Sequence, residues 1–183
     1  MSVVRKNINK RIVLAGGPGT GKTSVINALK KERFYCFEEA AREIFDEFKL
    51  KGLDFKTDPI RISENIFYKR KYDFESADTI DSKESVVFYD RGIHEITAYL
   101  NSIDKSSKYW DELPYRYNYD LIFLFDPWKE IYKKDKNRIE DFSDAQKISP
   151  FIFEVYKKSG VKMIKVPNLS IKERVKFILN NLP

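Results

Sequence analysis

The sequence predicts an α/β fold in which a parallel sheet carries helices on both faces. Five short apolar runs, rich in β-branched and aromatic residues, alternate with segments whose apolar residues recur at helical spacing. Strands that alternate with helices pair in parallel, and the crossovers cover both faces of the sheet. A glycine-rich loop separates the first apolar run from the first helical segment, which is the third observation behind this fold class.

Length and composition predict one domain, residues 1–183, with a sizeable core, because 42% of the residues are hydrophobic. Lys+Arg 34 against Asp+Glu 28 gives a net charge of +6, which suits an anionic ligand but is too diffuse to indicate nucleic acid. A single cysteine, Cys36, excludes an intrachain disulfide and a cysteine-based zinc site. The sequence shows no membrane span and no secretory signal, so we expect a soluble, cytoplasmic protein of unknown oligomeric state.

The first half of the chain opens with a short basic lead-in and then predicts three strands and four helices. The run 84–89 is the most apolar stretch since the first strand, as a buried parallel strand requires. Gly52 follows an amphipathic segment and closes it. The predicted strands are 11–15, 34–37 and 84–89, and the predicted helices are 21–32, 40–50, 60–77 and about 93–103.

The second half begins with an aromatic, irregular stretch, 107–118, in which we expect a short helix broken at Pro114. Residues 129–142 are dense in charge and poor in core residues, as in a mobile flap over a ligand. The next helix begins either with a capping box at Ser143 or, because of Pro150, restarts with Ser149 as its cap. The other predicted elements are strands 121–125 and 161–166, a helix ending at Lys158 before Gly160, and a last helix opening with the capping box Ser170 and Glu173.

Residues 16–23, Gly-Gly-Pro-Gly-Thr-Gly-Lys-Thr, match the pattern of a phosphate-binding loop. Glycines allow backbone dihedrals that turn successive N–H groups inward, and this nest lies at a helix N-terminus, which also attracts anions. Lys22 should reach the β- and γ-phosphates, and the Thr23 hydroxyl should ligate Mg²⁺. The residues expected at the nucleotide are Gly16, Gly17, Pro18, Gly19, Thr20, Gly21, Lys22, Thr23 and Ser24.

Acidic and basic residues follow the other predicted strands, and ligands of open α/β sheets bind beyond these carboxyl ends. Asp90 is placed to bind Mg²⁺ or to accept a proton from a substrate hydroxyl, and the alternative is that it caps the next helix. Arg91 is placed to hold a substrate or γ-phosphate oxygen. Glu39 and Arg42 lie three residues apart on one helix face, so they either contact the substrate or form a surface ion pair.

Arg138 and His94 are two further residues whose type suits catalysis. Arg138, in the charged stretch, is placed to swing onto the transferring phosphoryl group and neutralise charge in the transition state, unless it is only a solvated arginine. His94 has no cysteine or carboxylate cluster at metal-ligand spacing around it, so we expect it to be structural or on the surface.

The combined motifs resemble those of the AAA_28-type P-loop family, which includes the ribosylnicotinamide kinase domain and is similar to nucleoside and nucleotide kinases. The resemblance covers nearly the whole chain. It rests on the phosphate loop, on Glu39-Ala40-Ala41-Arg42-Glu43, on Asp90-Arg91-Gly92 before Ala98-Tyr99-Leu100, and on Asp126-Pro127-Trp128 with Ile131-Tyr132, Asp135 and residues 138–142.

This resemblance implies a five-stranded sheet of order 2-3-1-4-5, a small helical lid at about 128–142 that holds Arg138, and a nucleotide base near Pro167 and Asn168. It also implies that Glu39 and Arg42 line the acceptor pocket. The ribosylnicotinamide kinases carry an acidic residue where this chain has Gly92, so we expect an acceptor other than nicotinamide riboside.

The sequence therefore predicts a Mg²⁺-dependent phosphotransferase that uses ATP or GTP and a small, nucleoside- or nucleotide-like acceptor. Lys22, Asp90, Arg91 and Arg138 are the candidate catalytic residues, Glu39, Arg42 and Arg91 the candidate substrate contacts, and Thr23 and Asp90 the candidate metal ligands. The alternative is a nucleotide-dependent switch or slow ATPase or GTPase that acts through a protein or lipid partner. A nucleic-acid end kinase is favoured by the net charge alone.

Overall fold

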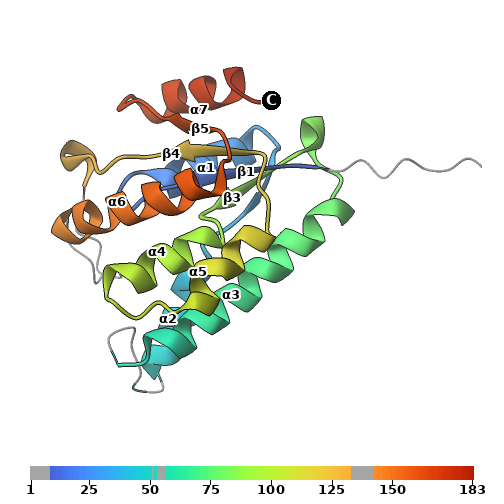
Figure 1. Cartoon of the computed structure of the whole chain (residues 1–183). Coiled ribbons are helices and arrows are strands. Elements are labelled where there is room, and N and C mark those ends of the chain that lie inside the picture. Colours follow the sequence, from blue (N-terminus) through green and yellow to red (C-terminus); the bar gives the residue numbers. More distant parts are fainter. Residues whose placement is uncertain (1–8, 51, 53–56, 133–141) are drawn as a thin grey trace, which may run out of the picture.

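A computed structural model describes residues 9–50, 52, 57–132 and 142–183. Its centre is a five-stranded parallel sheet in the order β2-β3-β1-β4-β5 (Figure 1). This order confirms both the predicted fold class and the strand order that the family resemblance implied. The strands are β1 Lys10–Ala15, β2 Tyr35–Phe37, β3 Val86–Asp90, β4 Leu121–Leu124 and β5 Met163–Lys165.

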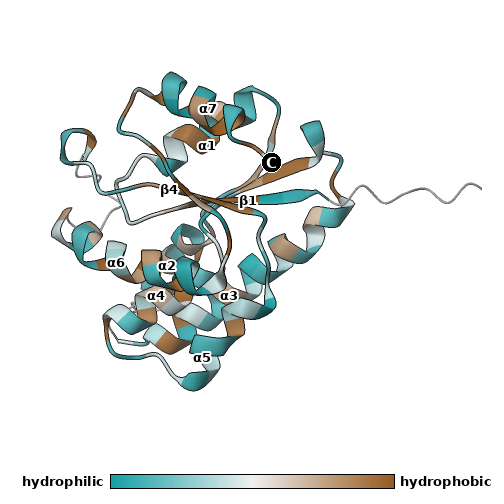
Figure 2. Cartoon of the chain, turned by 45° about the horizontal axis from the view of Figure 1, so that its top comes forward, coloured by the Kyte–Doolittle hydropathy of each residue, from teal (hydrophilic) through white to brown (hydrophobic). Residues whose placement is uncertain are grey.

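Helices cover both faces of the sheet, with α1 and α7 on one side and α3, α4 and α6 on the other (Figure 2). Each crossover therefore returns the chain to the same edge, and the carboxyl ends of all five strands lie together. The α-helices of the described residues are α1 Lys22–Lys31, α2 Ala40–Leu50, α3 Pro59–Ser76, α4 His94–Ser102, α5 Lys108–Glu112, α6 Phe142–Ser159 and α7 Ile171–Asn180.

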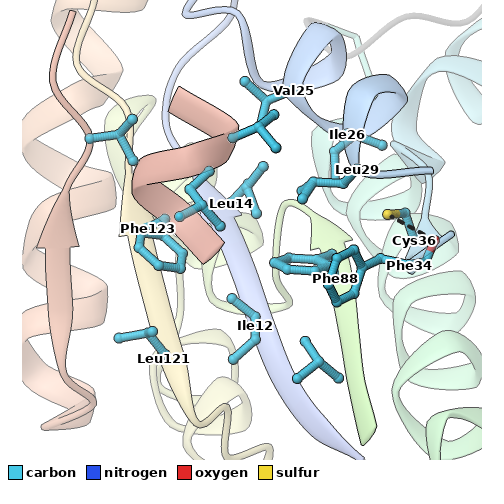
Figure 3. Close-up of a cluster of buried hydrophobic side chains, with 14 of the residues drawn as sticks. Ile12, Leu14, Val25, Ile26, Leu29, Phe34, Cys36, Phe88, Leu121 and Phe123 are labelled. Atoms are coloured by element: carbon cyan, nitrogen blue, oxygen red, sulfur yellow. Dashed lines mark hydrogen bonds between the residues drawn. The ribbon is translucent and has the colours of Figure 1, made fainter. Parts of the chain in front are cut away.

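Alternate residues of the central strands fill separate apolar clusters on the two faces. Ile12 and Leu14 of β1 pack with α1 and α7, and Figure 3 shows this cluster around Phe88 and Phe123. Val13, on the opposite face, packs with residues of α4 and α6. A third cluster joins α2, α3, α4 and α5. Because β1 is buried on both faces, the loop that follows it starts from a fixed position.

The structure corrects the predicted start of α6. This helix begins at Phe142, so Ser143 lies inside it, and it continues through Pro150 to Ser159 without a restart at Ser149. Ile148 and Ile152 are both buried, one turn apart, in the cluster beneath the sheet. A continuous helix buries both side chains, which favours continuation although proline cannot donate its backbone hydrogen bond.

Other local expectations are confirmed. Ser170 caps α7 by accepting a hydrogen bond from the backbone N–H of Glu173, and the Glu173 side chain accepts from the backbone N–H of Ser170. The aromatic stretch forms α5 and then a 3₁₀ turn, Leu113–Arg116, that contains Pro114. Most of the expected flap, residues 133–141, lies outside the described part of the chain. No helix among the described residues is long and apolar enough to cross a membrane.

Candidate functional site

The phosphate-loop sequence connects the end of β1 to the start of α1 and is packed tightly against two other elements. Gly16 has φ 144°, and a Cβ there would lie 2.4 Å from the carbonyl oxygen of Phe125, just beyond β4. A Cβ on Gly17 would lie 3.1 Å from the carbonyl oxygen of Ala145 in α6. Glycine is therefore required at position 16 by backbone conformation and by space, whereas a Cβ at position 17 would fit only if α6 shifted by a few tenths of an ångström.

Lys22, at the first position of α1, is buried against the loop's own oxygens. Its Nζ donates to the carbonyl oxygens of Gly16 and Gly17, both at 2.7 Å, and to Thr20 Oγ1 at 3.1 Å. Burial, with a smaller contribution from the nearby charge of Arg91, lowers the pKa of Lys22 to about 8. All three acceptors are uncharged, so an anionic phosphate oxygen would be a stronger partner for this ammonium group.

Asp90, the last residue of β3, lies opposite Leu14 of β1 and meets the start of α1. The Thr23 hydroxyl donates to Asp90 Oδ2 at 2.9 Å. The other carboxylate oxygen, Oδ1, is buried and has no hydrogen-bond partner among the described residues. Burial and the nearby charge of Glu39 raise the pKa of Asp90. A hydroxyl beside a carboxylate with an unsatisfied buried oxygen fits Mg²⁺, which prefers oxygen ligands.

Arg91 connects the phosphate loop to acidic residues of two other elements. Its Nη1 donates to the carbonyl oxygen of Gly16 at 2.9 Å and to Glu95 Oε2 of α4 at 2.8 Å, and its Nε donates to Glu39 Oε2. Arg91 has φ 75°, a left-handed conformation that is uncommon outside glycine and recurs at functional sites. The hydrogen bond to Gly16 holds the guanidinium against the loop.

Glu39, between β2 and α2, has a second arginine partner. Arg70 of α3 donates from Nη2 to Glu39 Oε1 at 2.9 Å and from Nη1 to the carbonyl oxygen of Gly92 at 2.8 Å. Burial alone would raise the pKa of Glu39, but Arg91, Arg70 and Lys22 together hold it below its usual value. Glu39 is therefore an anion between two cations, beside the phosphate loop.

A family profile described as "AAA domain" matches residues 11–174. The chain belongs to this AAA domain family. No curated protein matches the sequence significantly.

Solved structures share the fold of this AAA domain at low sequence identity. Deoxyadenosine kinase from M. mycoides with bound dATP is 14% identical, with a TM-score of 0.72 over 94% of this chain and 98% of that one. Thymidylate kinase from Candida albicans is also 14% identical, with a TM-score of 0.65 over 94% of this chain and 90% of that one. NadR protein in complex with NR is 14% identical to this chain, with a TM-score of 0.74. The match spans 96% of this chain but only 50% of NadR. The fold of the AAA domain is thus that of P-loop kinases.

The structure brings together most of the expected site residues of the AAA domain. Lys22, Thr23, Asp90, Arg91 and Glu39 form one connected cluster. Arg42 is exposed on α2, and the arginines that pair with Glu39 are Arg70 and Arg91. Arg138 lies outside the described residues. Pro167 and Asn168 follow β5 at the edge of the sheet where the loop lies, and Asn168 is exposed.

Sequence reasoning missed Arg70 and Glu95. Glu95 lies four residues after Arg91, a spacing that indicates an ion pair on one helical turn, and it interrupts an apolar pattern between Ile93 and Ile96. No local signal identifies Arg70, because its partner Glu39 is 31 residues away and its neighbours Lys69 and Lys71 make it resemble a solvated charge run.

His94 and Gly92 have structural explanations in this AAA domain. His94 is buried and stacks on the Tyr156 ring, with centroids 5.2 Å apart, and burial lowers its pKa to about 4. A Cβ on Gly92 would lie 2.5 Å from Tyr156 Oη and 3.0 Å from the Tyr119 ring. Position 92 therefore has no room for an acidic side chain.

Proposed function

We propose that the protein is a Mg²⁺-dependent kinase that transfers the γ-phosphoryl group of ATP or GTP to a hydroxyl or phosphate of a small, nucleoside- or nucleotide-like acceptor. The observation that carries the proposal is the pair Glu39–Arg91, because Arg91 also donates to Gly16 of the phosphate loop. An ionised carboxylate is thereby held next to the expected phosphate site, where an acceptor group would have to lie.

Each residue of the cluster has a role in this reaction. Lys22 and Arg91 would neutralise charge on the phosphoryl oxygens as it develops, and Arg138 would join them from the charged stretch. Thr23 and Asp90 would hold Mg²⁺, which supplies charge neutralisation on the phosphates when it is bound. Glu39 would accept a hydrogen bond from an acceptor hydroxyl, and Pro167 with Asn168 would lie near the nucleotide base. Arg42, exposed nearby, stays a candidate for contact with the outer part of the acceptor.

A hollow beside Glu39 supports the acceptor side of this proposal. It has a volume of about 360 Å³, within the range of small-molecule sites, and residues of β2, α2 and α3 line it. Tyr35 and Tyr72 supply aromatic surface, while Glu43 and Asp73 supply polar groups. An acceptor in this hollow would approach the phosphate loop past the Glu39 carboxylate.

A nucleotide-dependent switch is the second candidate, and one observation favours it. Arg91 holds the phosphate loop, α4 and the segment before α2 at once, through Gly16, Glu95 and Glu39. A change in the loop on nucleotide binding would therefore reach two helices without any acceptor. The output would then be a bound protein or lipid partner.

The deciding experiment measures ATP and GTP consumption with Mg²⁺ against nucleosides, nucleoside monophosphates and pyridine ribosides. We expect turnover that depends on the acceptor, and its loss in Lys22→Ala and Asp90→Asn. Lys31→Ala is the matched control, because Lys31 is an exposed lysine at the other end of α1. Nucleotide binding with only slow, acceptor-independent hydrolysis would contradict the kinase and favour the switch.

A further inference from the structure

Arg174, in the last helix, reaches the phosphate loop from the far end of the sequence. Its side chain is only 3% exposed, and its Nη1 donates to the carbonyl oxygen of Thr20 at 3.0 Å. Helix α7 lies beside α1 on one face of the sheet (Figure 2). The hydrogen bond to Thr20 places the Arg174 side chain at the loop just before α1. None of the motifs that define the phosphate loop includes this residue.

The charge of Arg174 has no acidic partner among the described residues. Its guanidinium instead lies over the rings of Trp128 and Phe125, with Cζ 4.7 Å and 5.7 Å from the ring centroids. Its Nε is buried and has no hydrogen-bond partner in the described part of the chain. Burial lowers the pKa of Arg174, in keeping with an unbalanced cation. Such a cation is costly unless it serves a neighbouring anion, and the adjacent loop is built to hold one.

The hydrogen bond to Thr20 also fixes the orientation of a peptide group in the loop. In a trans peptide the C=O and the following N–H point in opposite directions. Because the Thr20 carbonyl points to Arg174, the N–H of Gly21 points away from it. Gly21 fits closely against this contact, since a Cβ there would lie 2.9 Å from Arg174 Nη1 and its φ is 88°.

We propose that Arg174 is a positioning residue of the phosphate loop and that Trp128 holds its guanidinium in place. By fixing the peptide between Thr20 and Gly21, Arg174 keeps one N–H donor of the loop directed for a polyphosphate. Its charge, which has no acidic partner in the described part of the chain, adds attraction for the same anion. This inference rests on the proposed function only in requiring that the loop binds nucleotide phosphates.

The test uses two ligands that share the polyphosphate but not the base, MgADP and magnesium tripolyphosphate, in calorimetric titrations. Arg174→Met should weaken both by the same factor, about tenfold or more, the cost of losing a charged hydrogen bond. Arg174→Lys keeps the charge and should recover part of both affinities. Lys176→Met is the matched control, because it removes an exposed positive charge from the same helix and should leave both affinities unchanged.

The outcomes separate the alternatives. If Arg174→Met weakens MgADP but leaves tripolyphosphate unchanged, Arg174 contacts the nucleoside and the positioning role is wrong. If the variant melts at a lower temperature but binds both ligands as the wild type does, Arg174 is only structural. If Arg174→Met does not fold, the test is made with Arg174→Lys. The proposal then requires that this variant lose the same factor of affinity for MgADP and for tripolyphosphate. If the wild type binds neither ligand, the proposed function itself fails, and this inference with it.

Discussion

Six ionisable side chains lie together at the carboxyl ends of the strands: Lys22, Arg70, Arg91, Glu39, Asp90 and Glu95. Three are cations and three are acids, so the cluster is neutral when all are ionised. Buried ion pairs add little net stability, because desolvation offsets their attraction, whereas removing one partner leaves a costly unpaired charge. The cluster is therefore better explained by the charged ligand it would serve than by the stability of the fold.

Lys22 makes this argument testable through pH. Burial lowers its pKa from 10.5 to about 8 in the free protein, whereas a bound phosphate favours the ammonium form. Above about pH 8, nucleotide binding must therefore take up a proton, and ADP affinity should fall by up to tenfold per pH unit. Titrations at pH 7.5 and 9.5, in buffers of different ionisation enthalpy, measure both effects.

The lowered pKa of Lys22 has the opposite effect on the stability of the ligand-free protein, which should increase with pH where ADP affinity decreases. Between about pH 8 and 10.5 the unfolded chain holds the Lys22 proton and the folded protein does not, so the ligand-free protein gains stability as pH rises through this range. Lys22→Arg is the control, because a guanidinium stays protonated throughout, and its ADP affinity should not change with pH. Equal ADP affinity of the wild type at pH 7.5 and 9.5 would contradict the assignment.

At the scale of elements, two helices that lie late in the chain brace the phosphate loop. Helix α7 holds the carbonyl of Thr20 through Arg174, and α6 lies against Gly17 through Ala145 and Ile148. The strand–loop–helix unit that contains the motif is therefore not sufficient to shape the loop. Changes in the two helices should affect both the stability of the fold and the loop.

Helix α6 contains an exposed proline, Pro150, well inside its span. Proline removes one backbone hydrogen bond and crowds the preceding turn, so Pro150→Ala should raise the free energy of unfolding by about 1–3 kcal/mol. Urea denaturation followed by circular dichroism measures the change. Lys147→Ala, an exposed substitution one turn earlier, should change it by less than about 0.5 kcal/mol. An unchanged or lower value for Pro150→Ala would contradict this expectation.

In the whole molecule, features that depend on neighbouring residues could be predicted from the sequence, and features that depend on residues far apart in it could not. Period-2 and period-3.6 apolar patterns are local, so β1, α1 and the capping box of α7 could be found from neighbouring residues. The phosphate loop could be found because its chemistry needs contiguous residues. Arg70 and Arg174 could not, because their partners Glu39 and Thr20 become neighbours only when the sheet forms. At Pro150 the low helix propensity of proline led to the wrong prediction of a restart at Ser149, because burial of Ile148 and Ile152, one turn apart, outweighs that propensity.

The whole fold should respond to nucleotide, because strands, α6 and α7 all meet at the loop. A ligand that binds only the folded state adds about 2.7 kcal/mol of stability at a concentration a hundred times its dissociation constant. For a domain of this length, that corresponds to a rise in Tm of about 5–10 °C. Differential scanning fluorimetry with MgADP should show this rise.

Magnesium tripolyphosphate, which lacks the base, should also raise the melting temperature, because the Lys22 ammonium and the loop's N–H groups attract phosphate rather than the base. Measured against its own ligand-free melting temperature, Lys22→Ala should lose most of the MgADP response, and Lys31→Ala should keep the full response. A full shift with MgADP and none with magnesium tripolyphosphate would place the main binding energy outside the phosphate loop.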